Sequence, residues 1–246
     1  MNTESTSVAL VTGGSAGLGR ALVTALADAG WTVVTDARRP DRLSGLPPGV
    51  TAIAGDVTDA SHRDALVREV TRLGRLDLLV HNASALGPTP LPRLDEVSIE
   101  DLQSVWRPNI GAPLVLTAQL LPLLASGGGI LLSISSDAAA EHYPGWGLYG
   151  ASKAALDHVT QQFAAENPAI TGYAVDPGDM RTEMHQAASP GEDISDRPLP
   201  EAVVPALLQL LSSGLPSGRY RAADSPAAPI EGRSGRYPQA LRELVR

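Results

Sequence analysis

The stretch Ser7-Val-Ala-Leu-Val-Thr12, with Gly13-Gly-Ser-Ala-Gly-Leu-Gly19 directly after it, decides the fold of this chain. The apolar run predicts a buried strand, and the residues from Arg20 to Ala29 have the apolar spacing of a helix. A glycine-rich turn between a strand and a helix N-terminus can hold a pyrophosphate, because the glycines let the backbone approach the anion and the helix dipole attracts it. The stretch therefore predicts a phosphate-binding turn, although a glycine motif alone also occurs as a plain tight turn.

The rest of the chain alternates apolar runs with helical patterns. We expect strands at about residues 7–12, 31–36, 50–55, 76–81, 129–135, 170–176 and 218–222. We expect helices at about residues 18–29, 59–73, 98–107, 110–124, 148–166 and 200–213. Repeated crossovers of this kind predict an α/β fold: one domain over residues 1–222, with a doubly wound, mostly parallel seven-stranded sheet and helices on both faces. Residues 223–246 are predicted to form an irregular tail, in which 238–246 favours a short helix.

Composition limits the function classes. The net charge of -8 and the pI near 5.1 argue against a nucleic-acid surface. The chain has no cysteine, which excludes disulfides, thiolate metal ligands and cysteine nucleophiles and fits a cytoplasmic protein. The five histidines lack metal-ligand spacing, so we expect no metal site, and His62 is predicted to be exposed at a helix start. Met1 to Ser5 lacks the basic start of a signal peptide, and the apolar stretch 112–125 is too short and interrupted to predict a membrane span.

Tyr149 and Lys153 are four residues apart, which is about one helical turn, and would therefore lie on one helix face. A tyrosine has a reference pKa of about 10, and a neighbouring cation lowers that pKa by favouring the phenolate. Ser136, at the end of a predicted strand, could hold a carbonyl oxygen beside the phenol. This group predicts proton transfer to or from an alcohol or ketone oxygen, whereas Tyr-x-x-x-Lys alone is more often a solvated helix pair.

Further motifs follow in a fixed order: Asp56-Val57 after a predicted strand, His81-Asn-Ala-Ser84, Asn109, and Asp176-Pro-Gly178 with Thr182 beyond it. Together with the glycine turn and the tyrosine–lysine pair, they resemble the motifs of the short-chain dehydrogenase/reductase family. The resemblance covers residues 7 to 182 and, more loosely, continues to 222, and it implies a Rossmann fold. His81 and Ser84 stand where the family usually has Asn and Gly, so the turn after the fourth strand can differ.

The resemblance implies a catalytic tetrad of Asn109, Ser136, Tyr149 and Lys153. Tyr149 would exchange a proton with the substrate oxygen, Ser136 would orient that oxygen, and Lys153 would lower the pKa of the tyrosine and bond the nicotinamide ribose. Asn109, at a local break in its helix, would hold a water in a proton relay from Lys153. The implied cofactor-binding residues are Gly13, Ser15, Ala16, Gly17, Leu18, Gly19, Asp36, Arg38, Arg39, Asp56, Val57, Asn82, Ala83, Tyr149, Lys153, Pro177, Gly178, Met180 and Thr182.

The choice of cofactor depends on the end of the second strand, Val33-Val-Thr-Asp36-Ala37-Arg38-Arg39. An acid there usually accepts the ribose hydroxyls of NAD, and arginines bind the 2′-phosphate of NADP. Counted from Gly30, the family's ribose-binding acid would fall at Ala37, so that Asp36 comes one residue early. This register favours NADP(H), with NAD(H) as the alternative, since Ala16 stands where many NADP-preferring members have a basic residue.

The substrate is a small carbonyl compound or alcohol, according to the resemblance. Asp137, Ala138, His142, Tyr143, Trp146, Gly178, Asp179 and Met180 flank the tetrad and are candidates for its pocket, and the polar segment 183–199 is expected to be a loop over the site. Three function classes stay open: an NAD(P)-dependent oxidoreductase, a dinucleotide-binding regulator or scaffold without turnover, and a dehydratase or epimerase. Family members commonly pair through helices equivalent to 98–124 and 148–166, so we expect a homodimer or homotetramer.

Overall fold

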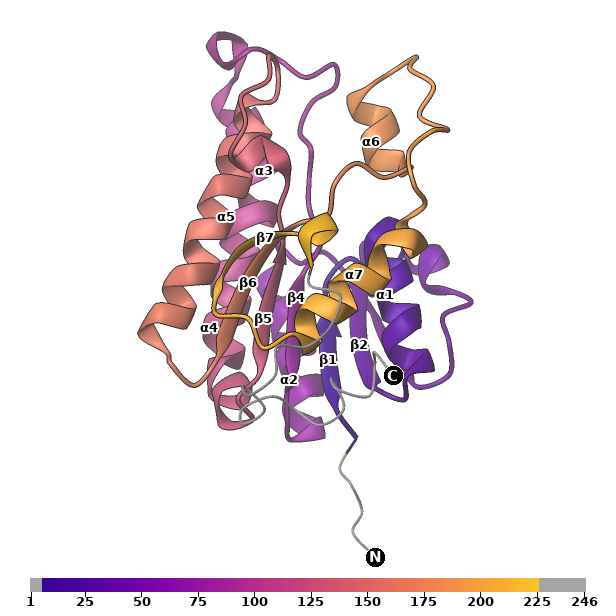
Figure 1. Cartoon of the computed structure of the whole chain (residues 1–246), viewed down its shortest axis with the longest axis vertical. Coiled ribbons are helices and arrows are strands. Elements are labelled where there is room, and N and C mark those ends of the chain that lie inside the picture. The colour runs from indigo at the N-terminus through magenta and orange to yellow at the C-terminus, as the bar shows by residue number, and fades with distance from the viewer. Residues whose placement is uncertain (1–5, 226–246) are drawn as a thin grey trace, which may run out of the picture.

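The computed structural model describes residues 6–225, which form one α/β unit around a seven-stranded sheet (Figure 1). The strands are β1 (Val8–Val11), β2 (Thr32–Ala37), β3 (Val50–Ala54), β4 (Leu78–His81), β5 (Ile130–Ile134), β6 (Thr171–Asp176) and β7 (Gly218–Arg221). Their order in the sheet is β3-β2-β1-β4-β5-β6-β7, and every neighbouring pair is parallel. The predicted doubly wound seven-stranded sheet is confirmed, and it is wholly parallel.

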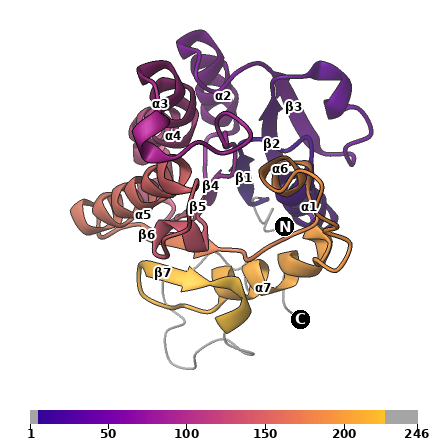
Figure 2. The ribbon, with the colours of Figure 1, turned by 90° about the horizontal axis from the view of Figure 1, so that it is seen from above.

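Helices cover both faces of the sheet, as Figure 2 shows from above. One face carries α1 (Gly17–Asp28) and α7 (Pro200–Ser212), and the other carries α2 (Ala60–Leu73), α4 (Ala112–Ser126) and α5 (Gly147–Glu166). The order of the sheet reverses between β1 and β4, because the chain winds outward in opposite directions from these two strands. A reversal of this kind leaves a crevice at the carboxyl ends of the strands, where ligands bind.

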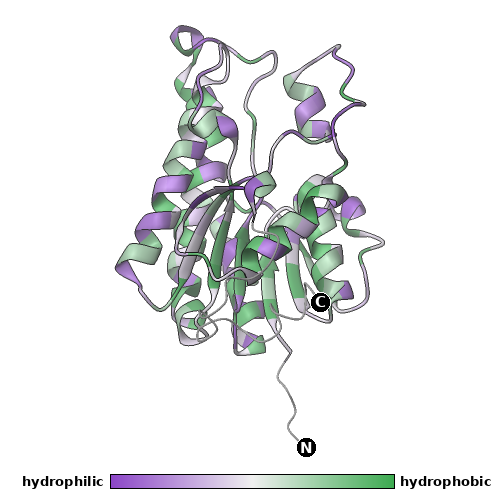
Figure 3. Cartoon of the chain, in the orientation of Figure 1, coloured by the Kyte–Doolittle hydropathy of each residue, from purple (hydrophilic) through white to green (hydrophobic). Residues whose placement is uncertain are grey.

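Alternating side chains of the strands supply two separate cores. Ala9 and Val11 of β1 pack toward α1 and α7, whereas Val8 and Leu10 pack toward α2, α4 and α5. All four side chains are buried, which is why β1 is apolar throughout and does not alternate with polar residues. Figure 3 shows the same pattern, with hydrophobic strands at the centre and hydrophilic residues on the outer sides of the helices.

The helix α3 (Ile99–Trp106) continues into α4 through a π-helical segment, Arg107–Gly111. The predicted pair of helices is therefore one helical run of 28 residues, long and apolar enough by length and composition alone to cross a membrane. Leu116, Leu120 and Leu124 of this run are fully buried in the protein core. Packing against the sheet thus explains part of the apolar composition of this run.

One helix was not predicted. The segment 183–199, expected to be a loop, begins with α6 (Glu183–Ala188), whose first turn is capped by the Thr182 side chain, which accepts a hydrogen bond from the His185 amide. Short 3-10 turns also occur at Pro40–Leu43, Leu94–Glu96, Asp137–Ala139 and Ala222–Asp224. The short helix predicted for 238–246 lies outside the described residues.

Candidate active site

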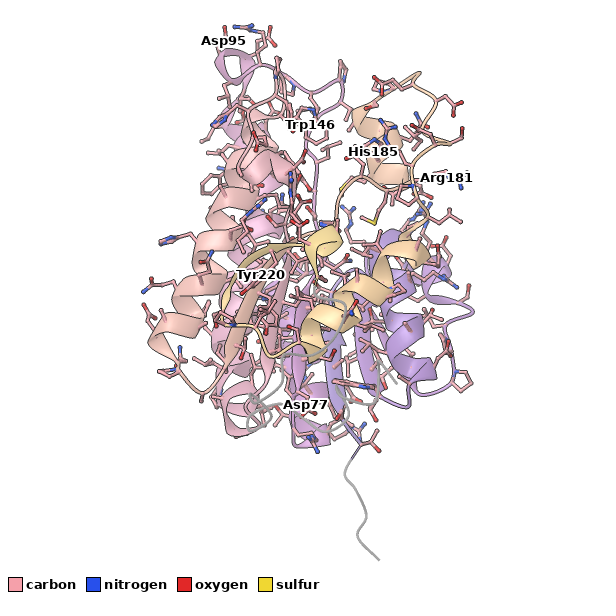
Figure 4. The ribbon with its side chains drawn as sticks, viewed as in Figure 1. Asp77, Asp95, Trp146, Arg181, His185 and Tyr220 are labelled. Atoms are coloured by element: carbon pink, nitrogen blue, oxygen red, sulfur yellow. The ribbon has the colours of Figure 1, made fainter. Side chains whose placement is uncertain are left out.

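Most of the predicted site residues line a cavity of about 1000 Å³ at the carboxyl ends of the strands. Its lining comes from the glycine turn after β1, from Asn82 after β4, from Ser136 after β5, and from the segment after β6. Figure 4 shows Trp146 and His185 at this end of the molecule, and Asp77 at the opposite end. One cavity therefore brings together the residues expected for phosphate binding and for proton transfer.

The shape of the glycine turn is fixed by hydrogen bonds from Asn82 and by the close packing of Gly19. Gly13 has a positive φ of 72°, and the Asn82 side chain donates hydrogen bonds to the carbonyl oxygens of Thr12 and Gly13, at 2.9 and 3.1 Å. A Cβ atom added at Gly19 would lie 2.3 Å from the Gly13 oxygen, so a larger residue does not fit there. Gly19 thus packs beneath the turn and does not line the cavity, whereas Gly13, Ser15, Ala16, Gly17 and Leu18 do.

Asp36 supports this turn from β2. Its Oδ1 accepts a 2.7 Å hydrogen bond from the Gly13 amide, and its Oδ2 lies 3.0 Å from Nε2 of His62 on α2. The prediction that His62 is exposed is wrong, because the ring is buried against the carboxylate and fits only beside a glycine: a Cβ atom at Gly55 would lie 2.2 Å from it. Both carboxylate oxygens of Asp36 consequently have protein partners.

The strand β2 ends at Ala37, and arginines follow it directly. A second, smaller hollow beside the glycine turn is lined by Ser15, Arg38, Arg39, Arg42 and Glu183. Three of these five residues are cationic, so the hollow can hold an anion, although Arg42 pairs with Glu183 of α6 at 2.7 Å. Arg42 was not predicted to line this hollow. It lies on the 3-10 turn Pro40–Leu43, four residues after Arg38.

Asp56 and Val57, which the resemblance implies as cofactor-binding residues, also lie at the cavity. Both come just after β3, and the Asp56 carboxylate accepts a 2.8 Å hydrogen bond from the Thr58 amide. Burial raises the pKa of Asp56, but the hydrogen bonds from Thr58 and the nearby Arg38 outweigh it, and the net pKa is lowered. Asp56 is therefore an ionised acceptor at neutral pH.

Tyr149 and Lys153 lie on α5 with their side chains on one face, as predicted. The Lys153 Nζ is 5.5 Å from the centroid of the Tyr149 ring and donates a 2.8 Å hydrogen bond to the Ile134 carbonyl at the end of β5. Burial lowers the pKa of Lys153 to about 8, with Asp157 acting in the opposite direction. Burial raises the pKa of Tyr149 to about 12, so the predicted lowering of this pKa is not found in the protein alone.

Asn109 lies at the predicted break in the helix, within the π segment, and is fully buried. Its Oδ1 accepts hydrogen bonds from the Ala85 amide and the Ser84 hydroxyl, at 2.7 and 3.2 Å. Its Nδ2 donates to the Ala85 carbonyl and to the Ser152 hydroxyl, both at 2.9 Å. The carboxamide thus uses both its hydrogens on protein groups, so its side chain has no donor left for the water that we expected it to hold.

Ser84 and His81, which depart from the family motif, both form hydrogen bonds within the protein. The Ser84 hydroxyl, which donates to Asn109 in the structure, lowers the pKa of the Tyr149 phenol against the larger effect of burial, because it can turn and donate to the phenolate. His81 is buried, with Nε2 2.7 Å from the Thr117 hydroxyl, and burial, with Lys153 contributing, lowers its pKa to about 3. His81 is therefore a neutral, internal hydrogen-bonding residue, and Ser84 can donate either to Asn109 or to the phenolate of Tyr149.

Ser136 and its neighbours form the substrate side. The Ser136 hydroxyl donates to Asp137 Oδ1 at 3.0 Å, and the Tyr143 hydroxyl donates to Asp137 Oδ2, also at 3.0 Å. Trp146 packs edge-on against Tyr149, with the ring centroids 5.8 Å apart. Ala138 and His142 were expected in the pocket, but neither lines the cavity, and Ala138 is buried against Tyr149.

The segment after β6 lines one side of the cavity. The Asp176 carboxylate accepts a 2.9 Å hydrogen bond from the Gly178 amide, and Gly178 has a positive φ of 76°. Oδ1 of Asp179 lies 3.8 Å from Nδ1 of His185, and Oδ2 of Asp179 lies 3.6 Å from Nε of Arg197. Lining residues that were not predicted come mainly from α3 and from α6 with its flanks: Gln103, Ser104, Arg107, Arg181, Met184, His185 and Leu199. Met184, His185 and Leu199 lie in the segment 183–199, which was expected over the site. The other four carry no sequence motif that could have placed them there.

Comparisons with known proteins agree with this geometry. A family model for the short chain dehydrogenases matches residues 7–193. A short chain dehydrogenase of Penicillium thymicola is 35% identical over 209 residues, which are 76% of this chain and 75% of that relative. Sepiapterin reductase of Rattus norvegicus is 33% identical over 201 residues, which are 74% of this chain and 77% of that relative. A short chain dehydrogenase structure from Shigella flexneri, complexed with NADP, aligns with a TM-score of 0.81 at 28% identity, covering 88% of this chain and 97% of that one. The chain therefore belongs to the short chain dehydrogenase family of oxidoreductases.

Proposed function

We propose that this protein is an NADP(H)-dependent oxidoreductase that reduces a ketone or aldehyde, or oxidises the corresponding secondary alcohol, by hydride transfer. The observation that carries the proposal is that Ser136, Tyr149 and Lys153 line the same cavity as the glycine turn. A phosphate-binding turn and a proton-transferring group in one cavity are what this reaction requires, because hydride and proton must reach adjacent atoms.

Three features favour NADP(H) over NAD(H). The Asp36 carboxylate, which would hold ribose hydroxyls in an NAD-dependent site, already contacts Gly13 and His62. Ala37 stands at the end of β2, where it offers no acceptor. The arginine-lined hollow beside Ser15 fits a phosphate, since guanidinium groups bind phosphate through paired charge-assisted bonds. The neighbouring family member from Shigella flexneri is complexed with NADP.

The protein's own groups would handle the proton. The nicotinamide cofactor supplies or accepts the hydride. Because the pKa of Tyr149 is raised to about 12, its phenol is protonated at neutral pH and can donate to a carbonyl oxygen that is becoming an alkoxide. Ser136 would turn its hydroxyl from Asp137 to the same oxygen and stabilise the developing charge. Lys153 would bring positive charge to the phenolate that is left behind.

The test combines turnover with one substitution. Purified protein is incubated with NADPH and a panel of ketones and aldehydes, and loss of NADPH absorbance is followed; we expect turnover with at least one compound. Tyr149→Phe keeps the buried ring and removes the hydroxyl, so this variant should bind NADPH normally and lose nearly all turnover.

The result discriminates between the three function classes. Normal ketone reduction by Tyr149→Phe would contradict the mechanism. NADPH binding without turnover on any carbonyl compound would favour a regulator or scaffold. Water loss or stereochemical inversion without net consumption of NADPH would identify a dehydratase or epimerase.

We also propose that the protein forms a homodimer or homotetramer. Leu114 and Val115 of α4 are 43% and 38% exposed, and Trp106 at the end of α3 is 36% exposed. These helices belong to the region through which family members commonly pair. Light scattering after size-exclusion chromatography gives the mass directly, and a monomer at micromolar concentration would contradict the proposal. A cytoplasmic location stays a prediction.

A further inference from the structure

Arg219 of β7 reaches from the edge of the sheet to two places beside the proposed tetrad. Its Nε donates to Asp157 Oδ2 at 2.9 Å, and one of its terminal nitrogens donates to the backbone carbonyl of Ser136 at 2.8 Å. Arg219 lies beyond residues 7–193, which the family model matches. Arg219 is therefore outside the part of the chain that carries the matched motifs.

Asp157 connects this arginine to the lysine. It lies one helical turn after Lys153 on α5, and both side chains are buried. Burial raises the pKa of Asp157, whereas the Ser135 hydroxyl, Arg219 and Lys153 favour its charged form. In turn, Asp157 raises the pKa of Lys153 against the larger effect of burial. Arg219, Asp157 and Lys153 thus form a row of alternating charges behind the cavity.

The other ionisable groups that face Lys153 do not replace Asp157. Tyr149, on the same helix, is protonated at neutral pH because burial raises its pKa to about 12. His81 of β4 is neutral, with a pKa lowered to about 3. Among the described residues, Asp157 is therefore the acid that favours the charged form of Lys153, and its pairing with Arg219 at 2.9 Å favours its own ionised form.

We propose that Arg219 and Asp157 are a positioning pair for the active site: Arg219 fixes the Ser136 backbone, and Asp157, restrained by Arg219, holds Lys153 in its charged form. The pair acts at the site of the proposed function, and its importance for turnover rests on that function. Its effect on Lys153 exists without substrate or cofactor, and can be measured independently.

The sequence offers a direct measurement, since Lys153 is the only lysine among the 246 residues. Protein labelled with ¹³C-lysine therefore gives one Cε resonance, and its chemical shift against pH reports the ionisation of this single group. Asp157→Asn removes the anion and should move the Lys153 midpoint to lower pH by about one pH unit, as expected when a neighbouring opposite charge is lost. Arg219→Gln releases Asp157 and makes its carboxylate easier to protonate, so this variant should move the Lys153 midpoint in the same direction by a smaller amount.

The direction separates this role from a structural one, because general loosening of the fold would expose Lys153 to water and move its midpoint to higher pH. Arg72→Gln is the matched control: Arg72 also pairs with an acid, Glu69 on α2, outside the cavity, and the Lys153 midpoint should not move. A shift to higher pH in Asp157→Asn or Arg219→Gln, or shifts no larger than that of Arg72→Gln, would overturn the proposal.

A double variant protects the test against unfolding, since removal of one partner leaves a buried charge unpaired. Asp157→Asn combined with Arg219→Gln leaves neither charge, and its Lys153 midpoint should match that of Asp157→Asn, because Arg219 acts on Lys153 through Asp157. A further shift in the double variant, as large as that of Arg219→Gln alone, contradicts the pair. If no carbonyl compound is turned over, the proposed function fails while the titration still decides the role of the pair.

Discussion

The Gly13 amide donates a 2.7 Å hydrogen bond to Oδ1 of Asp36, joining the glycine turn after β1 to the end of β2. His62 Nε2, at 3.0 Å, occupies the other oxygen of the same carboxylate. An acid at this place in the sequence would ordinarily indicate a preference for NAD. Here it shapes the turn that any dinucleotide must use, so its effect on binding should not depend on the 2′-phosphate.

We therefore expect Asp36→Ala to weaken NADPH and NADH binding by similar factors. A hydrogen bond to a charged group contributes about 1.5–3 kcal/mol, which corresponds to roughly ten- to a hundredfold in affinity. Fluorescence titration with both cofactors measures the two factors. Asp41→Asn, an exposed acid on the following 3-10 turn, is the control and should bind both normally. Loss of NADH binding alone would show that Asp36 holds the ribose.

Arg38→Ala should weaken NADPH binding much more than NADH binding, because only NADPH has the phosphate that this guanidinium would hold. Loss of one charge-assisted bond predicts a decrease in NADPH affinity of roughly ten- to a hundredfold. Arg39 and Arg42 line the same hollow, so the remaining affinity should still fall steeply with salt. An unchanged NADPH/NADH ratio in Arg38→Ala, with NADH binding abolished in Asp36→Ala, would identify an NAD-dependent enzyme.

The strands and the main helices could be predicted from the sequence because each depends on local pattern. Apolar runs fix the strands, and the spacing of Tyr149 and Lys153 fixes their common face. The partnership of His62 with Asp36 could not be predicted, since it joins residues 26 positions apart through a gap left by Gly55. α6 was missed for a related reason: it has only six residues, and it is placed by the Thr182 cap and by contact with Arg42.

Ser84→Ala should shift the pH dependence of alcohol oxidation to higher pH. Oxidation requires the phenolate of Tyr149, and the Ser84 hydroxyl, turned from Asn109, can donate a hydrogen bond to that phenolate and lower the pKa of the phenol. Without it, the phenolate forms at higher pH, by about 0.4–1 unit if the bond contributes about 0.5–1.5 kcal/mol. The measurement is kcat/KM against pH. Ser84→Thr keeps the hydroxyl and should follow the unsubstituted protein, and a Ser84→Ala profile that loses rate equally at every pH would assign Ser84 to structure alone.

Ser136→Ala should lower kcat for ketone reduction while leaving NADPH affinity unchanged. In the protein alone the Ser136 hydroxyl donates its one hydrogen to Asp137, at 3.0 Å, and it must turn toward the substrate oxygen to stabilise the developing charge. Removing a single donor of this type costs about 2.7–4 kcal/mol, or roughly a hundred- to a thousandfold in kcat. Ser136→Thr, which retains a hydroxyl, should keep more of the rate. Kinetics of Ser136→Ala within a factor of about two of the unsubstituted protein would mean that Ser136 holds the turn after β5 and takes no part in the reaction, because a donor acting in the transition state cannot be removed at so small a cost.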